Sequence, residues 1–230
     1  MIITPRTMDI LTNFVKINEG IVIRAGRTLS TIAPGKQLLA KADIDAEFPM
    51  DVAIADLRFL LQALKNMTQP VMKFDKAGRI TITENAKGAK PTRQTIPISS
   101  PDLIVHPKVV ETMPSIDLTF QIEATDFDDM LTTATRMKYE RIEIRGENGV
   151  VTLHVAGRRS SKFAGTSGWA RDVGTTADTF NFSFFTENFG LIRPDAYTVE
   201  MSAEGIAHFV GGLIEYWAVV EEDSFFTPGT

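Results

Sequence analysis

The sequence lacks cysteine altogether, which excludes a disulfide framework and any site built on thiolate ligands. Its three histidines, His106, His154 and His208, are widely separated, so a histidine-based zinc site is not expected. No apolar run approaches the length of a membrane span, and the first residues lack the basic-then-apolar pattern of a signal peptide. We therefore expect a cytosolic protein without cofactor, metal or membrane contact.

The composition is that of a globular protein with a sizeable core. The 230 residues are 43% hydrophobic and 23% charged, which suits one large domain or two ordinary ones. The net charge of −5 argues against a protein that coats nucleic acid with its whole surface. It leaves room for a local positive strip on an acidic body.

Residues 51–67 combine a short extended run with an amphipathic helix. Apolar side chains recur at the spacing of one helix face, at Leu57, Leu60, Leu61 and Leu64. Asp56 precedes them and is placed to accept backbone hydrogen bonds as the N-cap. The opposite face carries Arg58, Gln62 and Lys65. One side should pack on a sheet while the other presents positive charge, although an ordinary solvated face has the same pattern.

The first half of the chain follows the order helix, strands, strand into helix, strands. We predict a first helix over residues 5–16 with Thr4 as N-cap, the helix after Asp56, and strands over 20–24, 28–33, 37–44, 52–54, 71–74, 79–83 and 95–98. Residues 99–117 contain Pro101, Pro107 and Pro114, which suit neither a helix interior nor a central strand. We predict a linker there.

The second half repeats this order. We predict strands over 118–123, 143–146, 150–156, 179–185, 197–202, 208–211 and 214–221, with a short helix after residue 185. The first helix of this half buries Phe127, Met130, Leu131 and Ala134, and Thr125 to Asp128 have the spacing of a capping box. The fold class is therefore α+β, with two tandem domains (1–98 and 118–230, linker 99–117), each an antiparallel sheet with two helices. Open sheet edges would be paired by a head-to-tail association of subunits that closes into a ring.

Several patterns suggest chemistry but are better explained by structure. The Ala-Gly-Arg triplets at Ala25, Ala77 and Ala156 fall at strand ends and indicate turns rather than phosphate loops. The glycine-rich residues 165–174 are interpreted as a surface loop. The acids Asp126, Asp128 and Asp129 begin a helix, where they complement its dipole. No catalytic grouping is found, so we expect no enzyme.

Four blocks, taken together, resemble the sliding clamps of T-even-type bacteriophages. They are LTNFVKINEGIVIRAGRTLSTIA (11–33), DVAIADLRFLLQAL (51–64), TFNF (179–182) and YWAVVEED (216–223), in the same order over the same length. The resemblance implies the DNA-clamp fold and a homotrimeric ring of six domains around duplex DNA. It also implies a non-catalytic processivity factor of the phage DNA polymerase, placed on DNA by an ATP-dependent clamp loader in the infected bacterial cytoplasm, with a role in late transcription.

A sliding tether needs sparse cations that face phosphates through water rather than contacts to base edges. We predict such side chains on the exposed helix faces, at Arg6, Lys16, Arg58, Lys65, Arg136, Lys138 and Arg193. Asp9 and Asp129 share these faces, so the attraction should be weak. Each cation has the alternative role of an ordinary solvating charge.

For partner peptides, the resemblance points to an apolar groove near the linker. The predicted residues are Leu103, Ile104, Val105, Val109 and Met113, which have the alternative role of pinning the linker to the sheets. The tail 224–230 exposes Phe225 and Phe226 if it is disordered, but we favour packing on its own subunit. Two other functions stay open: a phage structural or assembly protein built on a duplicated β-rich module, and a hydrolase or binding protein with its site in the glycine-rich loop.

Overall fold

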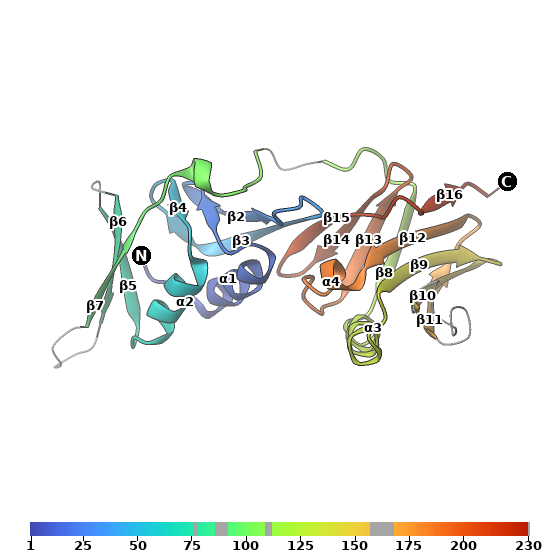
Figure 1. The fold of residues 1–230 in the computed structure, drawn as a ribbon, viewed down its shortest axis with the longest axis horizontal. Coiled ribbons are helices and arrows are strands. Elements are labelled where there is room, and N and C mark those ends of the chain that lie inside the picture. The colour runs from blue at the N-terminus through green and yellow to red at the C-terminus, as the bar shows by residue number, and fades with distance from the viewer. Residues whose placement is uncertain (76–77, 86–91, 109–111, 157–167, 230) are drawn as a thin grey trace. The chain divides into compact units, whose positions relative to one another are not determined.

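A computed structural model describes residues 1–75, 78–85, 92–108, 112–156 and 168–229. The chain separates into two compact units, Met1–Val110 and Glu111–Thr230, each of which combines antiparallel sheets with helices (Figure 1). This confirms the predicted α+β class. The predicted domain limits at residues 98 and 118 stay a prediction. No helix among the described residues is long and apolar enough to cross a membrane.

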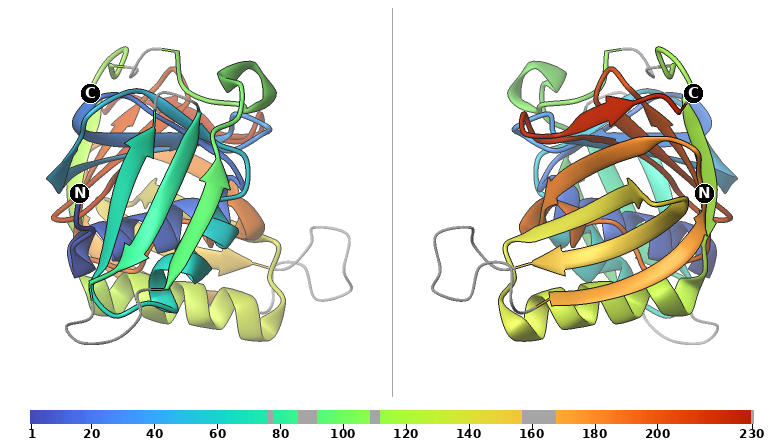
Figure 2. Two further views of the ribbon diagram at one scale, coloured as in Figure 1. Left: turned by 90° about the vertical axis from the view of Figure 1, so that its left-hand side faces the viewer. Right: turned by 90° about the vertical axis from the view of Figure 1, so that its right-hand side faces the viewer.

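The first unit contains two helices and seven strands among its described residues. They are α1 (Pro5–Ile17), β1 (Ile21–Ile23), β2 (Gly26–Ile32), β3 (Leu38–Phe48), β4 (Val52–Ile54), α2 (Leu57–Lys65), β5 (Pro70–Asp75), β6 (Arg79–Glu84) and β7 (Arg93–Pro97). Strand β1 pairs with β4, β2 pairs with β3, and β5, β6 and β7 form a three-stranded sheet. Figure 2 shows this last sheet from its open face, with α2 behind it.

The linker residues of the first unit form a short 3-10 helix, η1 (Pro101–Leu103). In the second unit the order is β8 (Leu118–Ile122), α3 (Ala124–Met137), β9 (Arg141–Glu147), β10 (Val150–Ala156), β11 (Gly168–Thr175), β12 (Thr179–Phe185), α4 (Thr186–Phe189), β13 (Tyr197–Ser202), β14 (Ile206–Gly211), β15 (Glu215–Val219) and β16 (Phe225–Thr227). One sheet has the order β11-β10-β9-β12-β16, and a second contains β15, β14, β13 and β8 in that order.

The strand that runs directly into a helix is confirmed in both units. In the first unit β4 leads through Asp56 into α2, whose apolar face is buried (Leu57, Leu60, Leu61 and Leu64 are each at most 5% exposed). In the second unit β12 leads into α4. The rings of Phe180, Phe182 and Phe184 lie buried on one side of β12, as the alternating pattern predicts. The ring of Phe189 in α4 packs against that of Phe184 at a centroid distance of 5.0 Å.

Two local predictions are wrong. Helix α3 begins at Ala124 after Glu123, so Thr125 already lies inside the first turn and cannot act as N-cap. The stretch 168–175 of the glycine-rich segment is not a loop but β11, paired with β10 along its whole length. Its glycines are tolerated because β11 lies at a sheet edge, where fewer neighbours need side-chain contacts. The triplet that starts at Ala156 continues into residues outside those described.

The C-terminal residues pack on their own unit, as favoured. Strand β16 adds antiparallel to β12, and the ring of Phe226 stacks on those of Phe180 and Phe182 at centroid distances of 6.1 and 6.2 Å. Phe225, its neighbour, points the other way and is 51% exposed, as the alternation of side chains along a strand requires.

Candidate nucleic-acid interface and partner surface

The helices of the first unit present a positive face. Helix α1 is capped by Thr4, whose hydroxyl accepts from the Thr7 amide at 3.2 Å, and it buries Ile10, Leu11 and Phe14. The outward side then carries the cations Arg6 and Lys16 and the acid Asp9, all exposed.

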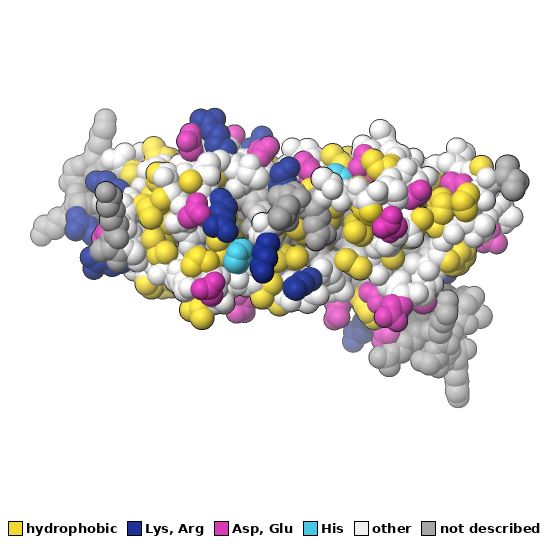
Figure 3. Space-filling model, turned by 90° about the horizontal axis from the view of Figure 1, so that it is seen from above, with side chains coloured by type: hydrophobic (Ala, Val, Ile, Leu, Met, Phe, Trp, Pro, Cys, Tyr) yellow, Lys and Arg dark blue, Asp and Glu magenta, His cyan; other side chains and the backbone are white. Residues whose placement is uncertain are grey.

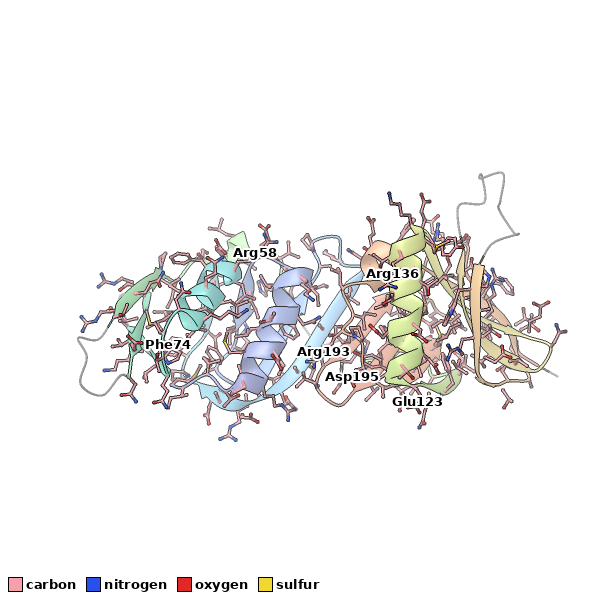
Figure 4. The ribbon with its side chains drawn as sticks, turned by 90° about the horizontal axis from the view of Figure 1, so that it is seen from below. Arg58, Phe74, Glu123, Arg136, Arg193 and Asp195 are labelled. Atoms are coloured by element: carbon pink, nitrogen blue, oxygen red, sulfur yellow. The ribbon has the colours of Figure 1, made fainter. Side chains whose placement is uncertain are left out.

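Helix α2 has the same character. Asp56 Oδ1 accepts from the Phe59 amide at 2.9 Å and so caps the helix as predicted. Arg58 and Lys65 are exposed, and Arg58 on α2 is marked in Figure 4. The Arg58 guanidinium lies 3.7 Å from the Glu19 carboxylate, and both side chains are mostly exposed. An exposed ion pair of this kind is weak, so Arg58 can still interact with an external anion. Helices α1 and α2 therefore carry four cations against one acid.

Helix α3 of the second unit is acidic instead. Its sequence holds Asp126, Asp128 and Asp129 against a single cation, Arg136. Arg171 from β11 partly neutralises these acids, because it donates to Asp126 at 2.6 Å and to Asp129 at 3.1 Å. Two carboxylates held by a guanidinium are not free ligands for a divalent ion, which agrees with the interpretation of this cluster as structural.

The predicted cations of the second unit lie at element ends. Arg136 lies in the last turn of α3, at the opposite end from Glu123 (Figure 4). Lys138 is the C-cap and adopts a left-handed conformation, with φ of 54°. Both side chains are exposed, and their position at the helix C-terminus is the one that the helix dipole favours.

Arg193 does not lie on a helix, because α4 ends at Phe189. It belongs to the loop after α4 and is only half-exposed, with Asp195 close by (Figure 4). Two buried tyrosines fix its backbone: Tyr197 donates to the Arg193 carbonyl at 2.5 Å, and the Arg193 amide donates to the Tyr216 hydroxyl at 3.3 Å. Burial raises the pKa of both tyrosine hydroxyls, so they stay neutral donors and acceptors at physiological pH.

The predicted partner-binding residues of the linker differ in their exposure. Ile104 is 7% exposed and packs with Val22 and Ala53, so it pins the linker, as the alternative interpretation holds. Leu103 and Val105 are 78% and 43% exposed. The Val105 carbonyl accepts from the Asn18 side chain at 2.8 Å. Met113 is half-exposed, and Val109 lies outside the described residues.

A pocket of about 290 Å³ lies in the second unit, and its lining includes none of these linker residues. Its apolar lining comes from Phe182, Val219, Val220 and Phe225, and its rim carries Glu204, Glu221 and Glu222. Figure 3 shows apolar and acidic side chains side by side over this half of the chain. Burial raises the pKa of Glu221, and the nearby Arg141 guanidinium, 3.6 Å away, opposes the shift. The volume suits one or two bulky apolar side chains rather than a whole small molecule.

A hydrogen-bond network holds one wall of this pocket. Asp117 accepts from the Ser115 hydroxyl at 2.6 Å and from the Ala203 amide at 2.8 Å, and these bonds lower its pKa. The Ser202 hydroxyl in turn accepts from the Glu204 amide at 3.1 Å. The turn 203–205 is thereby fixed in place beside the pocket.

None of the sequence-based predictions includes this pocket. The sequence does contain a signal for an apolar surface at this place. The adjacent Val219 and Val220 come at the end of the last long predicted strand, where polar loop residues are normally expected, and acidic residues follow them. The pairing of Arg171 with Asp126 and Asp129 was missed because β11 was interpreted as a loop.

Solved structures of similar fold identify the fold class of the chain. The chain aligns with the structure of the C-terminal region of FEN-1 bound to A. fulgidus PCNA (TM-score 0.71, 11% identity, 96% of this chain and 98% of that one). It also aligns with proliferating cellular nuclear antigen from Entamoeba histolytica (TM-score 0.66, 12% identity, 93% and 94%). The fold is therefore the DNA-clamp fold, as the resemblance implied.

The sequence relatives of the chain are sliding clamps of phages. No protein-family model matches the chain. It is 27% identical to the sliding clamp of Vibrio phage KVP40 over 94% of its length and 96% of the relative. It is also 26% and 25% identical to the sliding clamps of Escherichia phage RB69 and Enterobacteria phage T4, over 95% of its length and 96% of each relative. The resemblance to sliding clamps of T-even-type phages is thus confirmed along nearly the whole chain.

Proposed function

We propose that this chain is a non-catalytic sliding clamp that encircles duplex DNA and tethers a replicative DNA polymerase. The observation that carries the proposal is the likeness to phage sliding clamps over nearly the whole chain, on a fold of the clamp class. The positive outward face of α1 and α2 supports it, because a sliding tether needs cations without base-specific contacts.

The ring is a homotrimer that closes through sheet edges. In the first unit the outer edge of β5 is covered by the chain start, since the Met1 amino group donates to the Met72 carbonyl at 2.7 Å and the Met72 amide donates to the Met1 carbonyl at 2.8 Å. In the second unit β16 covers the edge of β12. Among the described residues, β7 ends the three-stranded sheet and β11 ends the five-stranded sheet, and both have a partner strand on one side only, as do β1, β2, β4, β8 and β16.

The open edges of β7 in the first unit and of β11 in the second unit belong to different strands. Contacts between unlike surfaces are head-to-tail and generate a ring when the rotation closes. Pairing β7 of one subunit with β11 of the next would remove both open edges, which otherwise invite aggregation. Three two-unit subunits, the number that the resemblance implies, give a six-unit ring.

DNA contacts come mainly from the first unit. Most of the attraction to DNA comes from the cations of α1 and α2, which are Arg6, Lys16, Arg58 and Lys65. Smaller contributions come from Arg136 and Lys138 at the end of the acidic helix α3 and from Arg193 in the loop after α4. Because only the first unit contributes strongly, the duplex is held loosely, and loose binding suits sliding. In the infected bacterial cytoplasm the partners are the phage polymerase, an ATP-driven clamp loader and factors of late transcription, with Leu103 and Val105 as exposed linker contacts.

Retention on circular DNA tests the proposal. The chain is loaded onto nicked circular duplex with a phage clamp loader and ATP, and unbound protein is removed by gel filtration at high salt. A clamp stays on the circle and leaves within minutes once a restriction enzyme linearises it. Equal retention on circle and linear DNA would contradict encirclement, and an oligomer indifferent to both DNAs would favour a structural or assembly protein.

A further inference from the structure

Strand β14 carries a histidine that lies between two carboxylates. His208 lies on the middle strand of β13, β14 and β15 (Figure 1), directly opposite Glu200 of β13 and Trp217 of β15. The His208 Nδ1 atom lies 2.9 Å from Glu200 Oε2, and its Nε2 atom lies 3.4 Å from Glu215 Oε2. The imidazole ring stacks on the Trp217 indole at a centroid distance of 4.2 Å. Since side chains alternate along a strand, this cluster lies on the face of the sheet opposite to the buried Phe209.

The hydrogen bond to Glu200 determines which nitrogen of His208 carries the proton. An ionised carboxylate can only accept a hydrogen bond, so the proton of a neutral His208 is on Nδ1. The Nε2 atom then presents a lone pair, and it makes no hydrogen bond to any residue that the structure describes. A second acceptor, the Glu215 carboxylate, lies beside it. Two neighbouring acceptors repel each other, and a cation between them would turn this repulsion into attraction.

The separation of these two acceptors suits a tetrahedral metal ion. Zn²⁺ binds histidine nitrogen and carboxylate oxygen at about 2.0–2.2 Å, so two such ligands at a tetrahedral angle lie about 3.4 Å apart. The distance from His208 Nε2 to Glu215 Oε2 is 3.4 Å. A metal-binding histidine usually donates its other ring N–H to a carboxylate, which orients the ring. Glu200 accepts that hydrogen bond here.

The site is accessible from solvent and has room for water. The side chain of His208 is mostly buried, whereas that of Glu215 is 36% exposed, so an ion can enter without unfolding of the sheet. Among the described residues no group of three or more histidine, aspartate or glutamate side chains could hold a metal ion. Two protein ligands leave two tetrahedral positions for water. A water there would be an acceptor for the buried indole N–H of Trp217, which has none in the described part of the chain.

We propose that His208 Nε2 and Glu215 bind a divalent transition-metal ion such as Zn²⁺, with Glu200 as the positioning residue and water in the remaining positions. The mixed nitrogen and oxygen ligands favour such an ion over Mg²⁺, which prefers oxygen ligands in octahedral geometry. The ion joins β14 to β15 and stabilises the folded sheet by binding it. Such a site needs only one histidine, so the wide separation of the three histidines in the sequence does not exclude it. The proposal does not depend on the clamp function.

Three substitutions separate the roles of these residues. His208→Phe removes the nitrogen ligand but keeps an aromatic ring that can stack on Trp217, so this variant should fold. Glu215→Gln removes the charged ligand at a partly exposed position. Glu200→Gln keeps an acceptor for the Nδ1 proton but removes its charge, and it therefore tests positioning rather than ligation.

The chain offers a matched control for each ligand. His154 also has a glutamate at Nδ1, since Glu143 lies 3.2 Å away. That carboxylate is shared with the Arg145 guanidinium, which disfavours a further cation beside it. His154→Ala should therefore leave metal binding unchanged. Glu187→Gln removes an exposed carboxylate from α4 and should also have no effect.

Isothermal titration with ZnCl₂, after treatment of the protein with EDTA and removal of the chelator, measures the site. We expect one Zn²⁺ per chain, with affinity lower by about tenfold or more in His208→Phe and in Glu215→Gln, and by about 10–100-fold in Glu200→Gln. Excess Mg²⁺ should not compete. Circular dichroism establishes that each variant is folded. No Zn²⁺ binding by the unchanged chain, or equal affinity in folded His208→Phe, would overturn the proposal.

Tryptophan fluorescence reports where the ion binds. The chain has two tryptophans, so Trp169→Phe leaves Trp217 as the only one. Imidazole suits Cu²⁺ as well as Zn²⁺, and Cu²⁺ at Nε2 should quench Trp217 because the two rings stack. In the same background Glu215→Gln should need much more Cu²⁺ for equal quenching. Quenching that Glu215→Gln leaves unchanged would place the ion elsewhere and refute the site.

The circular-DNA assay gives an independent result. A chain that stays on circular DNA but binds no Zn²⁺ refutes the metal site alone. A chain that binds Zn²⁺ through His208 and Glu215 but never stays on circular DNA refutes the clamp alone.

Discussion

At the scale of single residues, the charges on the helices differ between the two units. Helices α1 and α2 carry four cations against one acid, whereas α3 carries three acids against one cation. Arg171 neutralises part of the acidic cluster but does not reverse its sign. The two units should therefore contribute unequally to DNA affinity, which gives the first prediction.

Replacing Lys16 and Lys65 with glutamine should weaken sequence-independent DNA binding and its salt dependence. Each lost phosphate contact lowers the slope of log K against log salt concentration by about 0.9. The control replaces Lys36 and Lys73, which are exposed in a turn and on β5, and removes the same charge. Titrations of a short duplex at several salt concentrations measure the slope, and an equal loss in both pairs would contradict a helix-face interface.

Glu143 is a buried carboxylate whose partners make it stabilising. It is 8% exposed on β9 and is bonded to Arg145 and, at 3.2 Å, to His154. Burial raises its pKa, but the bonds to His154 and Arg145 outweigh this and leave the pKa lowered overall. A lowered folded-state pKa stabilises the fold above the ordinary glutamate value near 4.3, and this contribution is lost as the pH falls through the lowered pKa.

Glu143→Gln should therefore lower the free energy of unfolding by about 1–3 kcal/mol at pH 7, because two partly buried donors, Arg145 and His154, lose a charged acceptor. Urea unfolding at pH 7 and at pH values below 4 measures the effect, and the difference from the unchanged chain should shrink at the acidic end. Glu147→Gln, at the exposed end of the same strand, is the control. A pH-independent difference would mean that packing rather than charge is lost.

At the scale of elements, two helices begin in different ways. Asp56 caps α2 with its side chain, whereas Glu123 before α3 makes no such bond. Asp56→Ala should cost about 0.5–2 kcal/mol of stability, while Glu123→Ala should cost no more than about 0.5 kcal/mol. Thermal or urea unfolding compares them, and a larger loss at Glu123 would show that the caps are wrongly assigned.

The elements that the sequence predicts well are those in which one signal dominates. The leucines of α2 recur at helical spacing, and the phenylalanines of β12 alternate as in a strand. Both sets of side chains lie buried, as these patterns predict. The glycines of β11 favoured the prediction of a loop. The strand forms because it pairs with β10, and this pairing cannot be predicted from the local sequence. The prediction at Thr125 failed because a capping box is only a spacing of residue types, and the helix begins two positions earlier than that spacing requires.

The candidate site was less predictable for the same reason. Arg6, Lys16, Arg58 and Lys65 lie on exposed helix faces, since amphipathicity decides which way a helix turns. Arg193 lies in a loop fixed by Tyr197 and Tyr216, whose hydrogen bonds join residues distant in sequence. The pocket combines parts of β12, a turn and the tail, and its existence depends on tertiary pairing alone.

At the scale of the whole molecule, we propose that subunits join head to tail into a closed ring by pairing the open edge of β7 with that of β11. The most direct test is the solution mass by light scattering over a concentration series. A closed trimer has a mass of about 76 kDa, three times the 25.4 kDa of one chain, and should dissociate only on dilution. A mass of 25.4 kDa at every concentration would leave both edges unpaired and contradict it.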